Sequence, residues 1–304
     1  MDGFPVCSTV SRFRCSHPAA TTHHLYIHSF RHFLSFSVQP AETSALRELE
    51  GDRAIKPYII KTLGSGAKVG ICGITSKVST EQSSFPDEGT TFAEEAATAQ
   101  ACVEDIAAEG VNRVVLLTHN GYDEDMSTLA SIDGVDVIIG GHSHTLLGNE
   151  GLADIGFSPE AAYPQLVGGT CVVTAWEYSK VVGMVTVEFD DNGDVAACTG
   201  APVMPINPDK FTVRDAEESY DLESADAAIV ADYLLGFETF VDNGENQSVI
   251  DFLAPFTAEI EETTLEQIAT VPENICHTRG GEVDPLCPGK EELSTVGGGV
   301  CKCP

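Results

Sequence analysis

The chain has 304 residues, of which 42% are hydrophobic, and its 47 acidic against 16 basic side chains give a formal net charge of −31. A chain of this length and hydrophobic content can bury one large core or two modest ones. Its strong negative charge repels nucleic-acid backbones and anionic membrane surfaces, so we expect neither as a partner. No stretch approaches the roughly 18 uncharged apolar residues of a membrane helix, and we predict no transmembrane segment.

The acidic residues are unevenly distributed along the chain. Residues 3–41 contain none of them, whereas residues 42–304 contain 46 of the 47. The opening segment also holds five of the nine histidines and many Ser and Thr residues. Acid-poor N-termini of this kind are typical of organelle transit peptides, and the order of residues that marks a secretory signal is absent. We interpret residues 1–41 as a divergent segment, either disordered or an unreliable chain start.

Regular structure is predicted from residue 55 onwards. Two short β-branched runs, at residues 58–63 and 68–74, are separated by Gly-Ser-Gly-Ala and predict a hairpin. Residues 92–109 have apolar side chains at helical spacing, and Gly110 follows them as a stop signal. This segment therefore predicts a helix.

The middle of the chain alternates between strand and helix patterns. Residues 113–118 and 135–140 are apolar runs that predict buried strands, and residues 123–131 between them predict a short helix. Residues 171–176 and 182–189 predict two more strands, the second closed by an Asp-Asp-Asn-Gly turn. Strands that alternate with helices indicate a largely parallel α/β sheet.

The last third has a different character. Residues 221–241 and 249–264 predict acidic helical segments, and the chain is loop-like from residue 272. Four of the ten cysteines, Cys276, Cys287, Cys301 and Cys303, lie in this tail among Gly and Pro residues. Their spacing is more typical of a disulfide-stapled segment than of a zinc ribbon. We therefore expect an oxidising compartment and a secreted or extracellular protein.

Histidines follow both central apolar strands. Leu-Leu-Thr leads into His119, and Ile-Ile-Gly-Gly leads into His142 and His144. Because the carboxyl ends of parallel strands meet at one edge of a sheet, these imidazoles should face the same crevice. A single histidine at a strand end is usually an ordinary loop residue. The combination favours a site for two metals roughly 3.5–4 Å apart.

Four segments carry a resemblance to a known family. They are I-K-P-Y-I-I-K-T-L-G and K-V-G-I-C-G-I-T within residues 55–75, L-L-T-H-N-G at 116–121, D-G-V-D-V-I-I-G-G-H-S-H-T at 133–145, and A-W-E-Y-S-K-V-V-G at 175–183. In this order they resemble the calcineurin-like metallophosphoesterase domain of the 5′-nucleotidase family. The resemblance covers roughly residues 55–276 and implies a layered α/β sandwich of the metallophosphoesterase type.

The resemblance also implies the chemistry of the site. His119 and His142 match ligands of one divalent metal, and His144 matches a ligand of a second, the metals being zinc or manganese. The resemblance also implies that Asn120 lies beside the substrate. The implied reaction is hydrolysis of nucleoside monophosphates or related phosphate esters, with the metals activating water and clamping the phosphoryl group.

The chain departs from the family pattern at both ends. It contains neither of the family's upstream motifs, D-x-H and G-N-H, so we expect the first strands, the bridging carboxylate and the catalytic histidine to be absent. Such a site would bind one metal or none. The expected organisation is residues 1–41 divergent, 42–210 a partial metallophosphoesterase domain, 211–271 an acidic helical linker region, and 272–304 the Cys-rich start of a truncated C-terminal domain.

Three interpretations remain open. The first is a phosphoesterase of 5′-nucleotidase type that is weak or inactive as it stands. The second is a non-catalytic remnant, in which the three histidines and Asp123 or Asp125 hold one metal weakly. The third is a secreted, disulfide-stapled binding module. Trp176 and Tyr178 are assigned to the core and the rim rather than to stacking on a nucleobase, which the family assigns to its second domain.

Overall fold

The computed structural model describes residues 9–15, 38–39, 55–83, 86, 88–214 and 219–265. The chain divides into two compact units, Met1–Asn243 and Gly244–Pro304, which are described separately. Within residues 1–41 the described parts are two strands, β1 (Thr9–Cys15) and β2 (Val38–Gln39). The predicted Cys-rich tail lies outside the described residues, and the four-part organisation stays a prediction.

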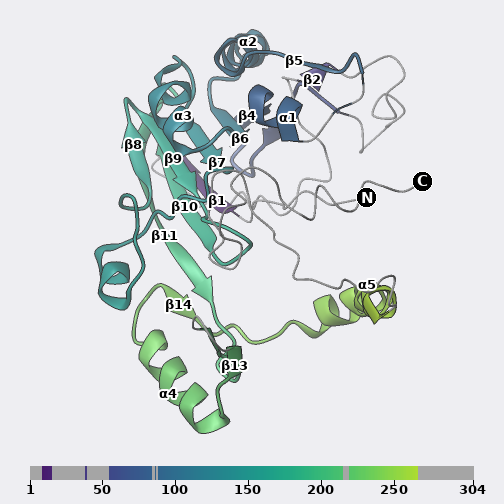
Figure 1. Ribbon diagram of the computed structural model, residues 1–304. Helices are drawn as coiled ribbons and strands as arrows, with labels where there is room; N and C mark the ends of the chain where they lie inside the picture. Colours follow the sequence, from purple (N-terminus) through teal and green to yellow (C-terminus); the bar gives the residue numbers. More distant parts are fainter. Residues whose placement is uncertain are drawn as a thin grey trace, which may run out of the picture. The chain divides into compact units, whose positions relative to one another are not determined.

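The first unit is built on a six-stranded sheet with the order β3-β4-β6-β7-β9-β8 (Figure 1). Its strands are β3 (Tyr58–Thr62), β4 (Lys68–Thr75), β6 (Val114–His119), β7 (Val137–Gly140), β9 (Thr170–Thr174) and β8 (Gln165–Val167). The four central strands run parallel, whereas β3 and β8 pair antiparallel at the two edges. The predicted hairpin and the largely parallel sheet are both confirmed.

Both faces of the central sheet are buried. One set of alternate residues, including Leu116 and Ile138, packs against helix α2 (Glu95–Ala108). The other set, including Val115 and Ile139, packs against strand β10 (Val182–Phe189). A strand that is buried on both sides needs apolar residues at every position, which explains the continuous apolar runs in the sequence.

A second sheet covers the face opposite α2, with the order β1-β10-β11-β14. Strand β10 pairs antiparallel with β11 (Val195–Pro205), and β14 (Phe240–Val241) adds to β11. Buried and half-buried residues alternate along β10 because only one of its faces meets the central sheet. Helix, sheet and sheet together form the predicted layered α/β sandwich.

Two disulfides fasten the outer layers to the central sheet. Cys72–Cys102 joins β4 to α2, and Cys171–Cys198 joins β9 to β11. They close chain segments of 30 and 27 residues, a size for which the restriction of the unfolded chain contributes about 3.5 kcal/mol each. The sequence suggested disulfides from the tail, whereas those that the structure describes lie in the main domain.

Short elements complete the described chain. They are α1 (Lys77–Ser83), β5 (Thr91–Phe92), α3 (Tyr122–Ser127), η3 (Leu129–Ser131), η4 (Glu150–Ile155), β12 (Thr212–Arg214), β13 (Ser219–Asp221) and α4 (Ser224–Leu235). The segment predicted to be helix-rich, residues 221–241, contains helix α4, and only its last residues depart from the prediction. Helix α4 stops before Gly236, and Phe240 enters β14 because its ring is buried in the core beside β11.

The described part of the second unit is one helix, α5 (Gln247–Leu265), close to the predicted residues 249–264. Its side chains Phe252, Phe256 and Ile260 are exposed. Among the described helices, none combines the length and the apolar character needed to cross a membrane.

Asp136 should make the stability of the protein depend on pH. Its side chain is 8% exposed and accepts a hydrogen bond from the Val114 N–H at 2.7 Å, and burial raises the pKa of the carboxyl to about 7. Because the folded pKa lies above the ordinary value of 3.8, stability should fall as pH rises from about 4 through about 7. Asp136→Asn keeps an oxygen that can accept the hydrogen bond from Val114 N–H, but it does not titrate. The loss of stability between about pH 4 and pH 7 should therefore be smaller in Asp136→Asn, as measured by the unfolding temperature across this pH range.

The exposed Asp105 on α2 offers a matched control, since Asp105→Asn should leave the pH dependence of the unfolding temperature as it is in the parent protein. Burial also raises the pKa of Asp125 to about 7. Asp125 should therefore account for the pH dependence of the unfolding temperature that remains in Asp136→Asn. An identical slope in Asp136→Asn and the parent would contradict the assignment.

Candidate active site

Four loops meet at one edge of the central sheet. Strands β4, β6, β7 and β9 are parallel, and their last residues lie in register: Thr75 beside His119, and Gly140 beside Thr174. The segments that follow these strands therefore emerge at the same edge. This is the position at which open α/β sheets bind ligands.

His119 and His142 lie side by side at this edge. Their ring centroids are 5.0 Å apart with an interplanar angle of 64°, and His142 Nε2 lies 3.4 Å from Ser79 Oγ on α1. Burial, and then the neighbouring His142 and His144, lower the pKa of His119. The neutral imidazole that this favours is the form that binds metal ions.

Two glycines allow these loops to approach. A Cβ at Gly141 would lie 3.3 Å from His119 Nδ1, and one at Gly121 would lie 3.7 Å from His142 Cδ2. Gly121 also has a φ of +100°, which side chains other than glycine rarely adopt. The Tyr122 N–H donates to Ser143 Oγ at 3.0 Å and ties the two loops together.

His144 makes a different set of contacts, with the loop after β9. Its Nδ1 lies 3.5 Å from Glu177 Oε2, and its ring centroid is 5.0 Å from that of Tyr178. Glu177 also accepts a hydrogen bond from Lys180 Nζ at 2.6 Å. The structure thus pairs His119 with His142, whereas His144 is held by Glu177.

Backbone strain is concentrated in the same two loops. The described residues other than glycine with positive φ are His142 (80°), His144 (53°), Trp176 (57°), Tyr178 (45°) and Ser179 (59°). Each such residue costs of order 1–3 kcal/mol, and strain of this kind clusters at functional sites. The loops that carry His142 and His144 are therefore held in shape by their surroundings.

The chain is similar in sequence and fold to several known nucleotidases. No family model matches the chain. A probable 5′-nucleotidase from Treponema pallidum is 28% identical over 256 residues, which cover 82% of this chain and 42% of that protein. Haemophilus influenzae NAD nucleotidase superposes with a TM-score of 0.64 at 26% identity, covering 75% of this chain and 45% of its own. A 5′-nucleotidase precursor from Thermus thermophilus superposes with a TM-score of 0.52 at 30% identity. That match covers 75% of this chain and 38% of the precursor chain.

The chain is similar in sequence and fold to proteins of the 5′-nucleotidase family. Its mixed α/β architecture matches the N-terminal metallophosphoesterase-type fold of these proteins. The chain spans less than half the length of each of the three relatives named above.

Two polar side chains beside the histidines have contrasting surroundings. The amide nitrogen and oxygen of Asn120 are buried and have no hydrogen-bond partner among the described residues. Asp125 is 1% exposed and accepts a hydrogen bond from Thr118 Oγ1 at 2.8 Å, beneath Gly140. Asp125 Oδ1 is likewise buried without a hydrogen-bond partner among the described residues, so both side chains keep unused polar atoms beside the strand ends.

His119 and His142 offer donor atoms of a kind that metal ions use, but fewer than a complete metal site needs. Zinc is usually held by four ligands, and imidazole nitrogen is a common one. His119 and His142 offer two such ligands for one ion. Across residues 55–83, 88–214 and 219–265, no group of three or more His, Cys, Asp or Glu side chains could hold a metal ion. The set of three histidines with Asp123 or Asp125 is therefore not assembled in the described part of the chain.

Sequence reasoning missed two residues of the site, Ser79 and Glu177. Ser79 contacts His142, and Glu177 contacts His144. Both follow strands of the parallel sheet, β4 and β9, so the rule that identified the histidines also applied to them. Ser79 has no distinctive motif of its own. Glu177 lies in the A-W-E-Y-S-K-V-V-G segment at 175–183, but only the folded loops reveal its contact with His144.

Proposed function

We propose that this chain contributes to a metal-dependent phosphoesterase of 5′-nucleotidase type that hydrolyses nucleoside monophosphates or related phosphate esters. The observation that carries the proposal is the close pair His119 and His142 at the carboxyl edge of the sheet. Named relatives support the substrate class, because their names describe nucleotidases and, in one case, an enzyme acting on NAD.

In this proposal the histidines divide between two ions. His119 and His142 would hold one divalent metal, zinc or manganese, and His144 would contribute to a second. When bound, such ions neutralise phosphate charge and activate water. The free amide of Asn120 can donate a hydrogen bond to a phosphate oxygen.

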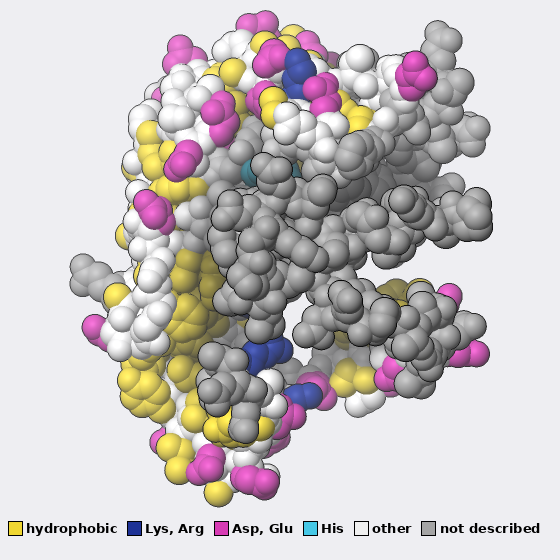
Figure 2. Space-filling model, viewed as in Figure 1, with side chains coloured by type: hydrophobic (Ala, Val, Ile, Leu, Met, Phe, Trp, Pro, Cys, Tyr) yellow, Lys and Arg dark blue, Asp and Glu magenta, His cyan; other side chains and the backbone are white. Residues whose placement is uncertain are grey.

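The charge of the chain supports a role for metal. Acidic side chains are scattered over the described surface in Figure 2, in keeping with the net charge of −31. Such a surface repels a phosphate ester unless cations lie at the binding site.

Phosphate release from a nucleoside monophosphate tests the proposal. Purified protein is incubated with the substrate and with zinc or manganese, and a metal-only blank is run alongside. We expect release that depends on both protein and metal. Release no greater than in the blank would remove the claim of intrinsic activity.

One observation favours a second candidate, a non-catalytic remnant. The described residues bring together two histidines and no third ligand. Metal content of protein purified without added metal separates the two candidates. Close to two ions per chain would exclude the remnant, whereas one or fewer, together with no phosphate release, would support it.

We propose a secreted or extracellular location, supported by the two disulfides in the main domain. A binding role for the Cys-rich tail stays a prediction. Mass mapping without reduction would show whether the tail cysteines pair with each other or with the main domain.

Glu177 should strengthen metal binding by orienting His144. Glu177 Oε2 lies 3.5 Å from His144 Nδ1, and loss of a carboxylate beside the second nitrogen of a ligating histidine typically weakens metal affinity about 10–100-fold. We therefore expect Glu177→Gln to weaken zinc binding by about tenfold or more, measured by competition with a chromophoric chelator. Glu109→Gln, an exposed change after α2, should leave the affinity unchanged. Equal affinities in Glu177→Gln and Glu109→Gln would exclude this role.

A further inference from the structure

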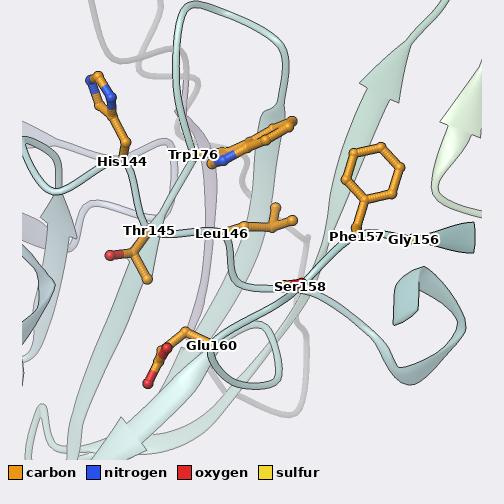
Figure 3. A pocket seen from close by; sticks show the side chains of 8 residues that line it. All are labelled: His144, Thr145, Leu146, Gly156, Phe157, Ser158, Glu160 and Trp176. Carbon is orange, nitrogen blue, oxygen red and sulfur yellow. The ribbon is translucent and has the colours of Figure 1, made fainter. Parts of the chain in front are cut away.

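A cavity of about 370 Å³ opens beside His144, and the chemistry proposed above does not use it. Trp176 and Phe157 line one end, Glu160 lines the other, and Leu146 lies between them (Figure 3). The volume lies at the lower end of the range for small-molecule sites. The lining thus combines two aromatic rings, an aliphatic side chain and a carboxylate in a space that suits a small ligand.

The aromatic end of the cavity is held in place by the core. The rings of Trp176 and Phe157 meet edge to face with centroids 5.7 Å apart, and the Phe157 centroid lies 6.2 Å from that of the buried Phe240. Trp176 is half-buried, so it packs with this core cluster, as the sequence indicated, and also lines the cavity. Both rings are therefore fixed before any ligand arrives.

The same tryptophan already contacts an ammonium group of the chain itself. Lys180 Nζ lies 4.7 Å from the centroid of the Trp176 ring and 5.8 Å from that of Tyr178, which is 63% exposed at the rim. The same Nζ donates a hydrogen bond to Glu177 at 2.6 Å. An aromatic ring attracts a cation that lies within about 6 Å of its centroid. The fold thus already forms one arrangement of an ammonium group with aromatic rings and a carboxylate.

Glu160 offers a second carboxylate, and this one has no cation beside it. In the described part of the chain the ion pairs involve Glu94 and Glu177, whereas Glu160 takes part in none. Glu160 is also the only acidic residue of the lining, and its N–H donates to the Leu146 carbonyl at 2.9 Å. A cationic ligand would therefore offset a charge that is held at the cavity and left unpaired.

We propose that the cavity binds a small quaternary ammonium ion, with its methyl groups against Trp176 and Phe157 and its charge offset by Glu160. Aromatic side chains are the groups that recognise methylated ammonium ions in proteins. The net charge of −31 also attracts cations to the protein and repels anions. A neutral ligand of the same shape gains from the apolar lining but from neither the carboxylate nor the ring faces. The proposal does not depend on the phosphoesterase activity.

Choline tests the proposal, and the alcohol in which a carbon atom replaces the nitrogen of choline is its uncharged counterpart. Each is titrated into the full chain without added metal. Binding is measured by saturation-transfer NMR on the methyl signals and by the emission of Trp176, the only tryptophan of the chain. We expect choline to bind saturably and to change Trp176 emission. The uncharged alcohol should bind about tenfold more weakly, or less tightly still.

Glu160→Gln should weaken choline binding about threefold or more, the size expected for an ion pair at an exposed carboxylate. The side chain is exposed and the hydrogen bond to Leu146 comes from the backbone, so the substitution leaves the fold intact. The control is Asp191→Asn, which removes the same charge from an exposed position in the turn after β10, outside the lining. It should bind choline as the parent does.

Three results with the parent protein would overturn the proposal: no saturable choline binding, binding that leaves Trp176 emission unchanged, or equal affinities for choline and the alcohol. Equal affinities of Glu160→Gln and Asp191→Asn for choline would also overturn it, because only the overall charge would then attract the cation. Phosphate release is measured separately with added metal, so failure of the ammonium site leaves the proposed phosphoesterase activity standing, and the reverse also holds.

Discussion

Replacement of His142 by Ala is expected to lower metal-dependent phosphate release by more than about 100-fold. Loss of a residue that only contacts a metal ligand already lowers metal affinity or activity by about 10–100-fold, and loss of the ligand itself should cost more. His142 is one of the two imidazoles that the fold brings together, with ring centroids 5.0 Å apart. Without it, His119 would be left as the single imidazole of the proposed pair of metal ligands. The measurement is kcat/KM for a nucleoside monophosphate over a range of zinc or manganese concentrations, with metal content determined on the same samples.

His142→Gly separates the chemical role from a folding defect. The φ of His142 is 80°, a conformation that glycine adopts without strain. We therefore expect His142→Gly to lose as much activity as His142→Ala while its unfolding temperature is equal to or above that of the parent. Ser79→Ala, which removes only the contact with His142 Nε2, should cost less activity than either. Full activity and unchanged metal content in His142→Gly would contradict the assignment.

Gly140→Ala is expected to destabilise the fold by about 2–4 kcal/mol, as the sum of overpacking and of disturbing a buried hydrogen bond. The added Cβ would overlap Asp125 Oδ2 and would lie 3.5 Å from Thr118 Oγ1. Asp125 has little room to retreat, since its side chain is 1% exposed and bonded to Thr118. Thermal unfolding should show a fall of roughly 5–10 °C.

Two further variants test the cause of this loss. Gly151→Ala is the matched control, because its Cβ would meet only Phe237 Cδ1 at 3.9 Å, an ordinary contact. In the double variant Gly140→Ala/Asp125→Ala the obstructing carboxylate is gone, so its destabilisation should be smaller than the sum of the two single changes. Additive losses would mean that Gly140 and Asp125 do not meet as the structure has them.

The elements that the sequence predicted best are those with the strongest pattern. The apolar runs of β6 and β7 and the helical spacing in α2 reflect burial against immediate neighbours, and their positions were correct within a few residues. The end of the segment expected to be helix-rich, residues 221–241, instead contains the short strand β14 at Phe240–Val241. Pairing with the edge of β11 and burial of Phe240 outweighed the local helical pattern there.

By itself the sequence determined the α/β class, the parallel sheet and the presence of His119, His142 and His144 at its carboxyl edge. These follow from residues close together in the chain, because hydrophobic periodicity and the alternation of strand and helix patterns along the chain are local properties. Only the tertiary structure decided that His119 pairs with His142, that Glu177 holds His144, and that Trp176 lines a cavity with Glu160. Each of these contacts joins loops that follow different strands, and the distance between such loops depends on how the whole sheet is packed.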